Sequence, residues 1–289
     1  MNKQYTYRQA NPLLRKSTYL LKPNIAGFRI LENLPFLHGF TYGKGSQNMS
    51  YKWEPGFLDE ATREEATERV KERIEHYLLT LGMSPITDSI FLQALSGDTR
   101  IIDASKNILK ISEHTDRGYF IQGGALFTTL PRTPIMMTSG DCHTLTIFAI
   151  NKLGIPVTGL IHAGRRELDA ELPRNALAHL IMHYACDPMD VHIGIVQGIG
   201  PDNHVIQEKD MQQAIQNPAM WQPYIRQHKE SGHFHLDNLQ LLLEQIKSVY
   251  IPGKNVEAYA TDNYVLAQNG KSFSHRARQG RILITSQLL

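Results

Sequence analysis

The chain has 289 residues, which is enough for one large domain or two of ordinary size. Hydrophobic residues make up 42% of it and charged residues 20%, so it is not a disordered, collagen-like or coiled-coil chain. The 30 basic and 28 acidic residues leave a net charge of +2, too small a surplus to favour a polyanion. We therefore expect a small-molecule substrate, with no nucleic-acid or membrane partner; the oligomeric state does not follow from the sequence.

The two cysteines and the opening residues suggest where the protein works. With only Cys142 and Cys186, the chain has no disulfide framework, which fits a reducing compartment. Charged and polar residues interrupt the early apolar runs, and no stretch approaches the roughly 20 apolar residues that a membrane span needs. We expect a cytoplasmic protein.

The first part of the chain predicts an extension, a set of strands and a helix. Residues 1–26 are weakly periodic and are expected to form an N-terminal extension, whereas residues 27–289 carry an ordered pattern. Short apolar runs punctuated by Gly, Asn and Ser predict strands joined by tight turns over 27–48. An acidic start followed by apolar residues at helical spacing predicts a helix over 59–81, with Gly82 as its C-cap.

The middle and end of the chain continue with interleaved strands and helices. Short segments rich in β-branched and bulky residues predict further strands, which are SIFLQAL, TRIIDA, GALFTTL, PIMMTS, LTIFAI, PVTGLIHA, VHIGIVQGI and a closing strand within SFSHRARQGRILITSQ. Helices are predicted over 171–186, with Pro173 in the first turn, and over 235–250. Without a repeat or linker, this order predicts a single α/β domain with a central mixed β-sheet flanked by helices.

The densest group of reactive residues lies within residues 138–167, which contain a predicted hairpin. If the chain turns about Lys152, Cys142 lies directly opposite His162 and shares a face with it, although a slip of one residue would separate them. The imidazole would then take the thiol proton and activate a thiolate nucleophile, or both side chains would bind zinc or copper. The third alternative is a buried cysteine that packs as a small hydrophobe beside a backbone-bonded histidine.

Several short motifs resemble a known family. The segments TSGDC and IHAGRRE resemble the TADC and HAGWRG motifs of the laccase-domain family, the YfiH-type proteins described as multicopper polyphenol oxidases and as purine nucleoside phosphorylases. Further matches follow in the family's order across residues 27–286. The resemblance implies a compact cysteine-hydrolase-like α/β fold, with Cys142 and His162 as catalytic and metal-binding residues. It also implies phosphorolysis of purine nucleosides or deamination of adenosine, with nucleoside and phosphate as substrates.

The sequence departs from the family pattern at residues that bear on the chemistry. Where the family has QVHG, this chain has QALS, so that Leu95 stands at the third ligand position. A catalytic zinc usually has three protein ligands, so we expect zinc or copper to bind only weakly to a site with the two ligands Cys142 and His162. Arg165 and Glu167 replace the tryptophan and the final glycine of HAGWRG, which changes the charge and shape offered to a substrate.

Four other residues are predicted to bind substrate. Arg166 and Arg276 can hold an anionic group through their guanidinium groups, and Asn48 and Gln93 can hydrogen-bond a base or an amide. Three functions remain open from the sequence: a purine-nucleoside enzyme, a metal-independent cysteine hydrolase or deamidase, and an inactive binding or regulatory protein. The second requires no ligand at Leu95, and the third is motivated by the lost motif residues.

Overall fold

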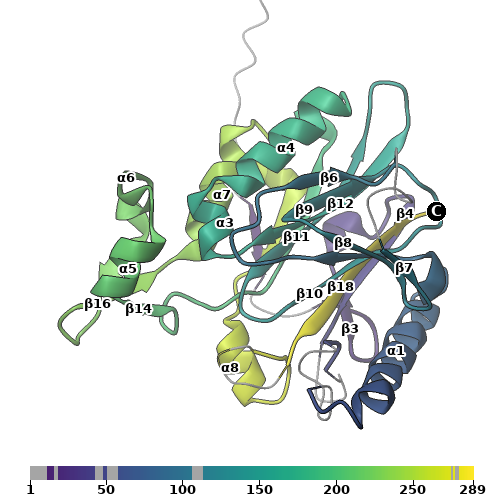
Figure 1. The fold of residues 1–289 in the computed structure, drawn as a ribbon. Helices are drawn as coiled ribbons and strands as arrows, with labels where there is room; N and C mark the ends of the chain where they lie inside the picture. Colours follow the sequence, from purple (N-terminus) through teal and green to yellow (C-terminus); the bar gives the residue numbers. More distant parts are fainter. Residues whose placement is uncertain are drawn as a thin grey trace, which may run out of the picture.

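The two longest strands, β11 (His143–Ile150) and β12 (Pro156–Ala163), are buried along nearly their whole length, which requires packing on both faces. The computed structural model describes residues 12–15, 19–42, 48–50, 58–105, 113–274, 276 and 280–289. Within these residues the strands form two large mixed sheets that pack face to face, with helices on their outer faces (Figure 1). The predicted single-domain α/β class is confirmed, but the strands are divided between two large sheets and a small third one.

The hairpin forms with a register different from the predicted one. Thr144 pairs with His162 and His143 with Ala163, so the hairpin turns about Leu153 rather than Lys152. Cys142 precedes β11 and lies two residues from the partner of His162. Because side chains alternate with a period of two, a shift of two residues keeps Cys142 on the face of His162. The predicted register was wrong, while the shared face was right.

The seven-stranded sheet contains the hairpin at its centre. Strand β12 pairs antiparallel with β11 and β9, and β13 pairs parallel with β17. In spatial order the strands are β1 (Leu13–Arg15), β17 (Val256–Tyr259), β13 (His192–Val196), β11, β12, β9 (Ala125–Thr128) and β6 (Ile101–Asp103).

The eight-stranded sheet packs against it through a largely aromatic and aliphatic interior. Phe40, Phe148, Leu160 and Ile284 belong to one buried cluster that draws on both sheets. In spatial order its strands are β2 (Tyr19–Lys22), β3 (Ile25–Gly27), β4 (Phe36–Thr41), β18 (Ile282–Leu288), β10 (Ile135–Ser139), β5 (Ile90–Gln93), β8 (Gly118–Gln122) and β7 (Glu113–Thr115). Strands β1 to β3 bring the described part of residues 13–26, expected to be an extension, into both sheets.

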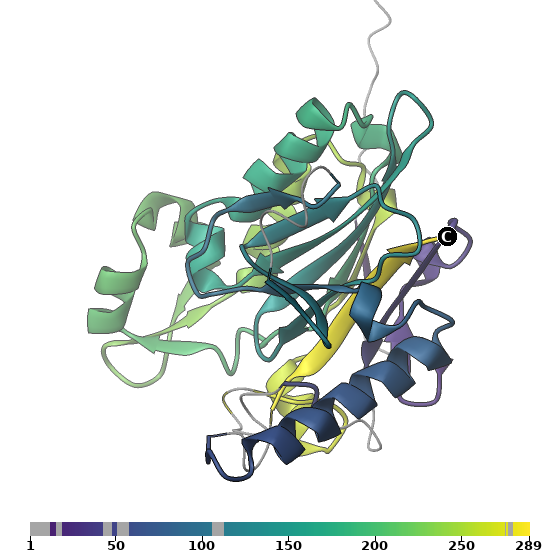
Figure 2. The same ribbon diagram turned by 45° about the vertical axis from the view of Figure 1, so that its right-hand side comes forward.

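Helices complete a four-layer sandwich (Figures 1 and 2). Helices α4 (Leu172–His183) and α7 (Asn238–Ser248) cover the outer face of the seven-stranded sheet, and α1 (Arg63–Thr80) covers that of the eight-stranded sheet. All three were predicted within a few residues, as was Pro173 in the first turn of α4. No helix in the described ranges is both long and apolar enough to cross a membrane.

A small unit projects from one edge of the sandwich (Figures 1 and 2). The sequence did not predict this unit, which consists of β14 (Val205–Gln207), α5 (Glu208–Ala214), α6 (Pro218–Trp221), β15 (Ile225–Gln227) and β16 (His233–Leu236). Fully buried Trp221 fastens it to α3 (Arg165–Asp169) by donating its indole N–H to the Asp169 carboxylate at 2.9 Å. The remaining helices are α8 (Asn263–Gln268) and the short 3₁₀ helices η1 (Arg29–Leu31), η3 (Ile86–Asp88), η4 (Pro188–Asp190), η5 (Gln222–Tyr224) and η6 (Gly253–Asn255).

Candidate active site

Three reactive side chains meet at the open end of the β11–β12 hairpin, around Gly164. A Cβ atom on Gly164 would lie 2.6 Å from Oε2 of Glu167, 2.9 Å from Sγ of Cys142 and 3.2 Å from Cε1 of His162. Contacts below 3 Å are too close for an ordinary side chain, so a glycine is what allows the three groups to converge. We call Cys142, His162 and Glu167 the Cys-His-Glu cluster.

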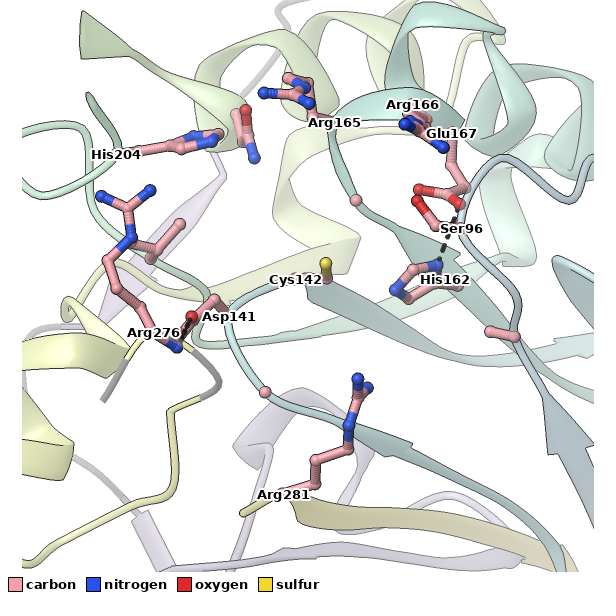
Figure 3. A pocket seen from close by; sticks show the side chains of 15 residues that line it. Ser96, Asp141, Cys142, His162, Arg165, Arg166, Glu167, His204, Arg276 and Arg281 are labelled. Carbon is pink, nitrogen blue, oxygen red and sulfur yellow. Dashed lines mark hydrogen bonds and ion pairs between the residues drawn. The ribbon is translucent and has the colours of Figure 1, made fainter. Parts of the chain in front are cut away.

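His162 lies between the other two members of the cluster. Its Nδ1 is 3.4 Å from Oε1 of Glu167, and Figure 3 shows the opposite side of the ring facing Cys142. Burial lowers the pKa of His162, but Cys142 and then Glu167 more than offset that effect and leave it at about 10. At neutral pH His162 is therefore an imidazolium, and it lies between the Cys142 sulfur and the Glu167 carboxylate.

Glu167 is held in place from two sides. It lies in the short helix α3, which begins one residue after Gly164, and its side chain is almost fully buried. The backbone N–H of Gly97, in the loop after β5, donates a hydrogen bond to Oε1 of Glu167. Burial raises the pKa of Glu167, but His162 and the Gly97 N–H outweigh it and hold the pKa below its usual value. Glu167 is thus an ionised carboxylate directed at His162.

The role of Glu167 could not be seen in the sequence. There it stood out only as a departure that alters charge and shape. A carboxylate that orients a histidine beside a cysteine is a recurring arrangement in enzymes with activated nucleophiles. The available signal was its position five residues after His162, but the Gly97 contact that fixes its side chain comes from a distant loop.

A cavity of about 600 Å³ opens onto the cluster, and we call it the cysteine cavity. Cys142 is partly exposed in it, so the sulfur is accessible. Four arginines surround the sulfur at a distance in Figure 3, and they come from α3 and from the C-terminal segment. The cavity is lined by Ala94, Ser96, Gly140, Asp141, Cys142, His162, Gly164, Arg165, Arg166, Glu167, Ile199, His204, Asn238, Arg276 and Arg281.

Asp141 and His204 line the same cavity with different roles. The Asp141 carboxylate accepts hydrogen bonds from the Ser274 hydroxyl and from the backbone N–H of Arg276, which fastens the C-terminal segment to the cavity. The pKa of His204 falls to about 3, because of burial first and then the nearby Arg276 and Arg165. His204 is therefore neutral at pH 7. Asp141 was not predicted as part of the site.

The structure brings together four of the six residues predicted for catalysis and substrate binding. Cys142, His162, Arg166 and Arg276 all line the cysteine cavity. Asn48 and Gln93 are not among its lining residues.

The two remaining residues have other positions in the fold. The Asn48 side chain accepts hydrogen bonds from the backbone N–H groups of Ser50 and Arg281 and donates one to the carbonyl of Ser50, so it ties two backbone segments together. Gln93 is exposed at the end of β5.

The donor set does not match a three-ligand metal site. Leu95 is 52% exposed and is absent from the cavity lining, although its neighbours Ala94 and Ser96 belong to it. An alkyl side chain cannot coordinate a metal, and Glu167 is directed at His162. In the part of the chain that the structure describes, no group of three His, Cys, Asp or Glu side chains is arranged to hold a metal ion.

Comparisons with known proteins agree with this fold. The chain belongs to the family of the multi-copper polyphenol oxidoreductase laccases, whose model matches residues 58–286. YfiH from Bacillus licheniformis has a similar structure, with a TM-score of 0.74 at 15% identity over 94% of this chain and 99% of that chain. YlmD from Geobacillus stearothermophilus has a TM-score of 0.71 at 16% identity, with 94% of this chain and 98% of that chain covered.

A third structure extends the agreement to another organism. Neisseria meningitidis protein NMB0706, of the DUF152 family, has a TM-score of 0.64 at 16% identity, with 91% of this chain and 98% of that chain covered. These structures establish the fold. No curated protein matches the chain in sequence.

Proposed function

We propose that this chain is an enzyme in which Cys142 is the nucleophile, His162 is its acid and base, and Glu167 positions His162. The observation that carries the proposal is the buried Glu167 carboxylate 3.4 Å from Nδ1 of His162, on the side of the ring away from the thiol. An oriented imidazole beside an accessible thiol is the arrangement that thiol-dependent acyl transfer requires. It needs no ligand at Leu95.

The reaction that fits these groups best is hydrolysis of an amide. The Cys142 thiolate forms a bond to the carbonyl carbon, and the C–N bond breaks while the His162 imidazolium gives its proton to the leaving amine. Water then attacks the resulting thioester and yields its proton to His162, which releases the carboxylic acid and restores the thiolate. The arginines of the cysteine cavity favour an anionic substrate.

A second function is favoured by the same arginines. Arg166, Arg276 and Arg281 line the cavity that contains Cys142, and guanidinium groups suit inorganic phosphate as well as carboxylate. Phosphorolysis of a purine nucleoside would use that phosphate as the attacking group and release the free base. In this version, and in deamination of adenosine, Cys142 and His162 would contact the nucleoside or hold zinc or copper.

The experiment that separates these functions combines elemental analysis, thiol labelling and turnover. We expect metal-free protein to react with one equivalent of iodoacetamide at pH 7, at Cys142, and to release ammonia from amides of anionic compounds. Stoichiometric zinc or copper together with phosphate-dependent turnover of inosine or adenosine would favour the nucleoside enzyme instead. If Cys142 does not react with iodoacetamide and no turnover depends on it, as tested with Cys142→Ser, both enzymatic functions would be excluded and a binding protein would remain.

A further inference from the structure

Three arginines form a shared wall between the cysteine cavity and a second cavity. Arg165, Arg166 and Arg276 line both spaces. The second space, which we call the outer cavity, has a volume of about 520 Å³ and lies between α3 and the projecting small unit. Its other lining residues are Val205, Ile206, Gln207, Asp210 and His233.

Among the described residues, no carboxylate forms an ion pair with an arginine of this wall. Arg276 donates from Nη1 to the carbonyl of Asn203 at 2.6 Å and from Nη2 to that of Val205 at 3.4 Å, and both acceptors are neutral. Nε of Arg165 is buried without a hydrogen-bond partner among the described residues. Burial and then the adjacent Arg166 lower the pKa of Arg165, and the nearby Asp210, Cys142 and Asp169 offset this only in part.

The other titratable groups around the wall do not cancel its charge. Asp210 in α5 faces the outer cavity and favours the charged form of Arg165, but within the described residues no ion pair joins it to an arginine of the wall. His233 lines the same cavity, with its Nδ1 3.2 Å from the carbonyl of Ser231 and 3.9 Å from Oε2 of Glu230. On the cysteine side, Glu167 is directed at His162, and Asp141 accepts hydrogen bonds from Ser274 and the Arg276 backbone.

We propose that the arginine wall and the outer cavity form a phosphate subsite, so that the substrate of this enzyme carries its own phosphate group. The reacting carbon would lie beside Cys142, and the phosphate would lie among Arg165, Arg166 and Arg276. A phosphate monoester presents three terminal oxygens, which matches three guanidinium groups better than the two oxygens of a carboxylate. The inference rests on the proposed function, because it assigns the substrate class of the same site.

Binding can be measured without any reaction by using the Cys142→Ser protein. We would titrate it calorimetrically, at constant ionic strength, with inosine, inosine 5′-monophosphate and inorganic phosphate. We expect the monophosphate to bind at least tenfold more tightly than inosine, and inorganic phosphate to compete with it. Equal affinity for inosine and its monophosphate, or no binding of either phosphate compound, would overturn the subsite.

Arginine variants locate the binding. Arg165→Gln should weaken binding of the monophosphate about tenfold, and Arg166→Gln should do so as well, since removing one partner of a charge-assisted contact usually costs about that much. Arg166 is exposed, so its variant serves if Arg165→Gln does not fold. The matched control is Arg226→Gln, in the same small unit, whose side chain is 60% exposed and pairs with Asp202. Equal affinity in all three variants would contradict the proposal.

The two levels of the proposal fail separately. Iodoacetamide labelling of Cys142 in the otherwise unchanged protein tests the nucleophile, and calorimetry tests the subsite. Rapid labelling without discrimination for phosphate would overturn the subsite alone. Tight binding of the monophosphate to a protein with an unreactive Cys142 would overturn the nucleophile and leave a phosphate-binding pocket.

Discussion

The two cysteines of this protein lie at opposite ends of one hairpin and have opposite surroundings. Cys142 precedes β11 at the open end, where it is partly exposed beside a charged imidazolium. Cys186 lies at the turn end, where it forms an isolated bridge with Asn151 and is 2% exposed in the apolar core. Burial raises the pKa of Cys186 to about 11.

The difference teaches that the hairpin supplies a position and the neighbouring elements supply the chemistry. At the open end, α3 contributes a carboxylate and two arginines, and the loop after β5 contributes the Gly97 N–H. At the turn end, the neighbours of Cys186 are mainly aliphatic side chains of the core. A thiol becomes reactive where a cation and access to solvent coincide, and only the open end offers both to a cysteine of this chain.

The largest expected effect concerns the two thiols themselves. With a pKa of about 11, only about one Cys186 in 10,000 is a thiolate at pH 7, whereas Cys142 is partly exposed beside the imidazole of His162. Cys142→Ser should therefore abolish rapid iodoacetamide labelling, and Cys186→Ser should leave its rate unchanged. Mass spectrometry of samples quenched at successive times measures both rates. Rapid labelling that Cys186→Ser abolishes would contradict the comparison.

A pair of glycine substitutions tests the two ends of the hairpin in turn. Gly164→Ala places a Cβ atom 2.9 Å from the Cys142 sulfur, which must move the cluster, so we expect labelling to slow by more than tenfold. Gly154 has a φ of 76° and open space around it, so Gly154→Ala should cost about 1–2 kcal/mol of stability and leave labelling intact. Urea denaturation and labelling kinetics measure both outcomes; equal labelling of the two variants would contradict the proposed convergence at Gly164.

Removing the charge of Glu167 tests its positioning role. Glu167→Gln keeps the size of the side chain but removes one of the groups that raise the pKa of His162. If that pKa falls by one unit, the imidazolium is favoured about tenfold less. We expect the alkaline limit of the pH profile of labelling to move below about 10, with the difference from the unchanged protein seen in the alkaline range. Partial restoration of the pH profile in a Glu167→Asp variant would show that the carboxylate positions His162 and does not merely fill space. An unchanged profile in Glu167→Gln would exclude the positioning role.

The arginines should make Cys142 selective for anionic reagents. Iodoacetate and iodoacetamide differ in charge, so the ratio of their labelling rates reports the potential in the cysteine cavity. We expect Arg165→Gln to lower this ratio by about threefold at low ionic strength, and added salt to reduce the difference. Arg174→Gln, on the exposed surface of α4, is the control. A ratio that no arginine in the cavity affects would argue against an anionic substrate.

The free energy of unfolding should also depend on pH. Burial lowers the pKa of His38 to about 4 and that of His204 to about 3, below the unfolded value of 6.5. The unfolded chain therefore binds more protons between these values, so each histidine should lower the free energy of unfolding by up to about 3 kcal/mol as pH drops from 6.5 to 4. The contribution of His162, whose pKa is raised, is instead lost as pH rises through about 10. Urea midpoints that do not change between pH 6.5 and 4 would contradict this assignment.

Local patterns predicted much of the architecture because they act within single elements. The span of β12 and the position of α4 followed from apolar runs, helical spacing and Pro173. The hairpin register did not follow, since Oδ1 of Asn151 accepts hydrogen bonds from the backbone of Leu153 and Ile155 and fixes a five-residue connection.

The features that the sequence did not predict depend on contacts between distant segments. Trp221 is buried in the hydrophobic cluster beneath α4 and α7 and donates to Asp169, which lies 52 residues earlier. Glu167 faces His162 because Gly97, 70 residues earlier, donates to its carboxylate. The pattern of apolar residues within one segment does not indicate which distant residue it will contact. The thiol and imidazole could be paired from sequence because a hairpin is local, whereas the third member of the cluster could not.

The short connection between β12 and α3 places the histidine, its carboxylate and two arginines within residues 162–167. Recognition of a charged group and activation of the sulfur therefore depend on one hexapeptide, so a change that alters one will usually disturb the other. Of the three arginines of the wall, only Arg276 lies outside the hexapeptide, in the C-terminal segment. Substitution of Arg276 can therefore change the affinity for an anionic group while residues 162–167 stay intact.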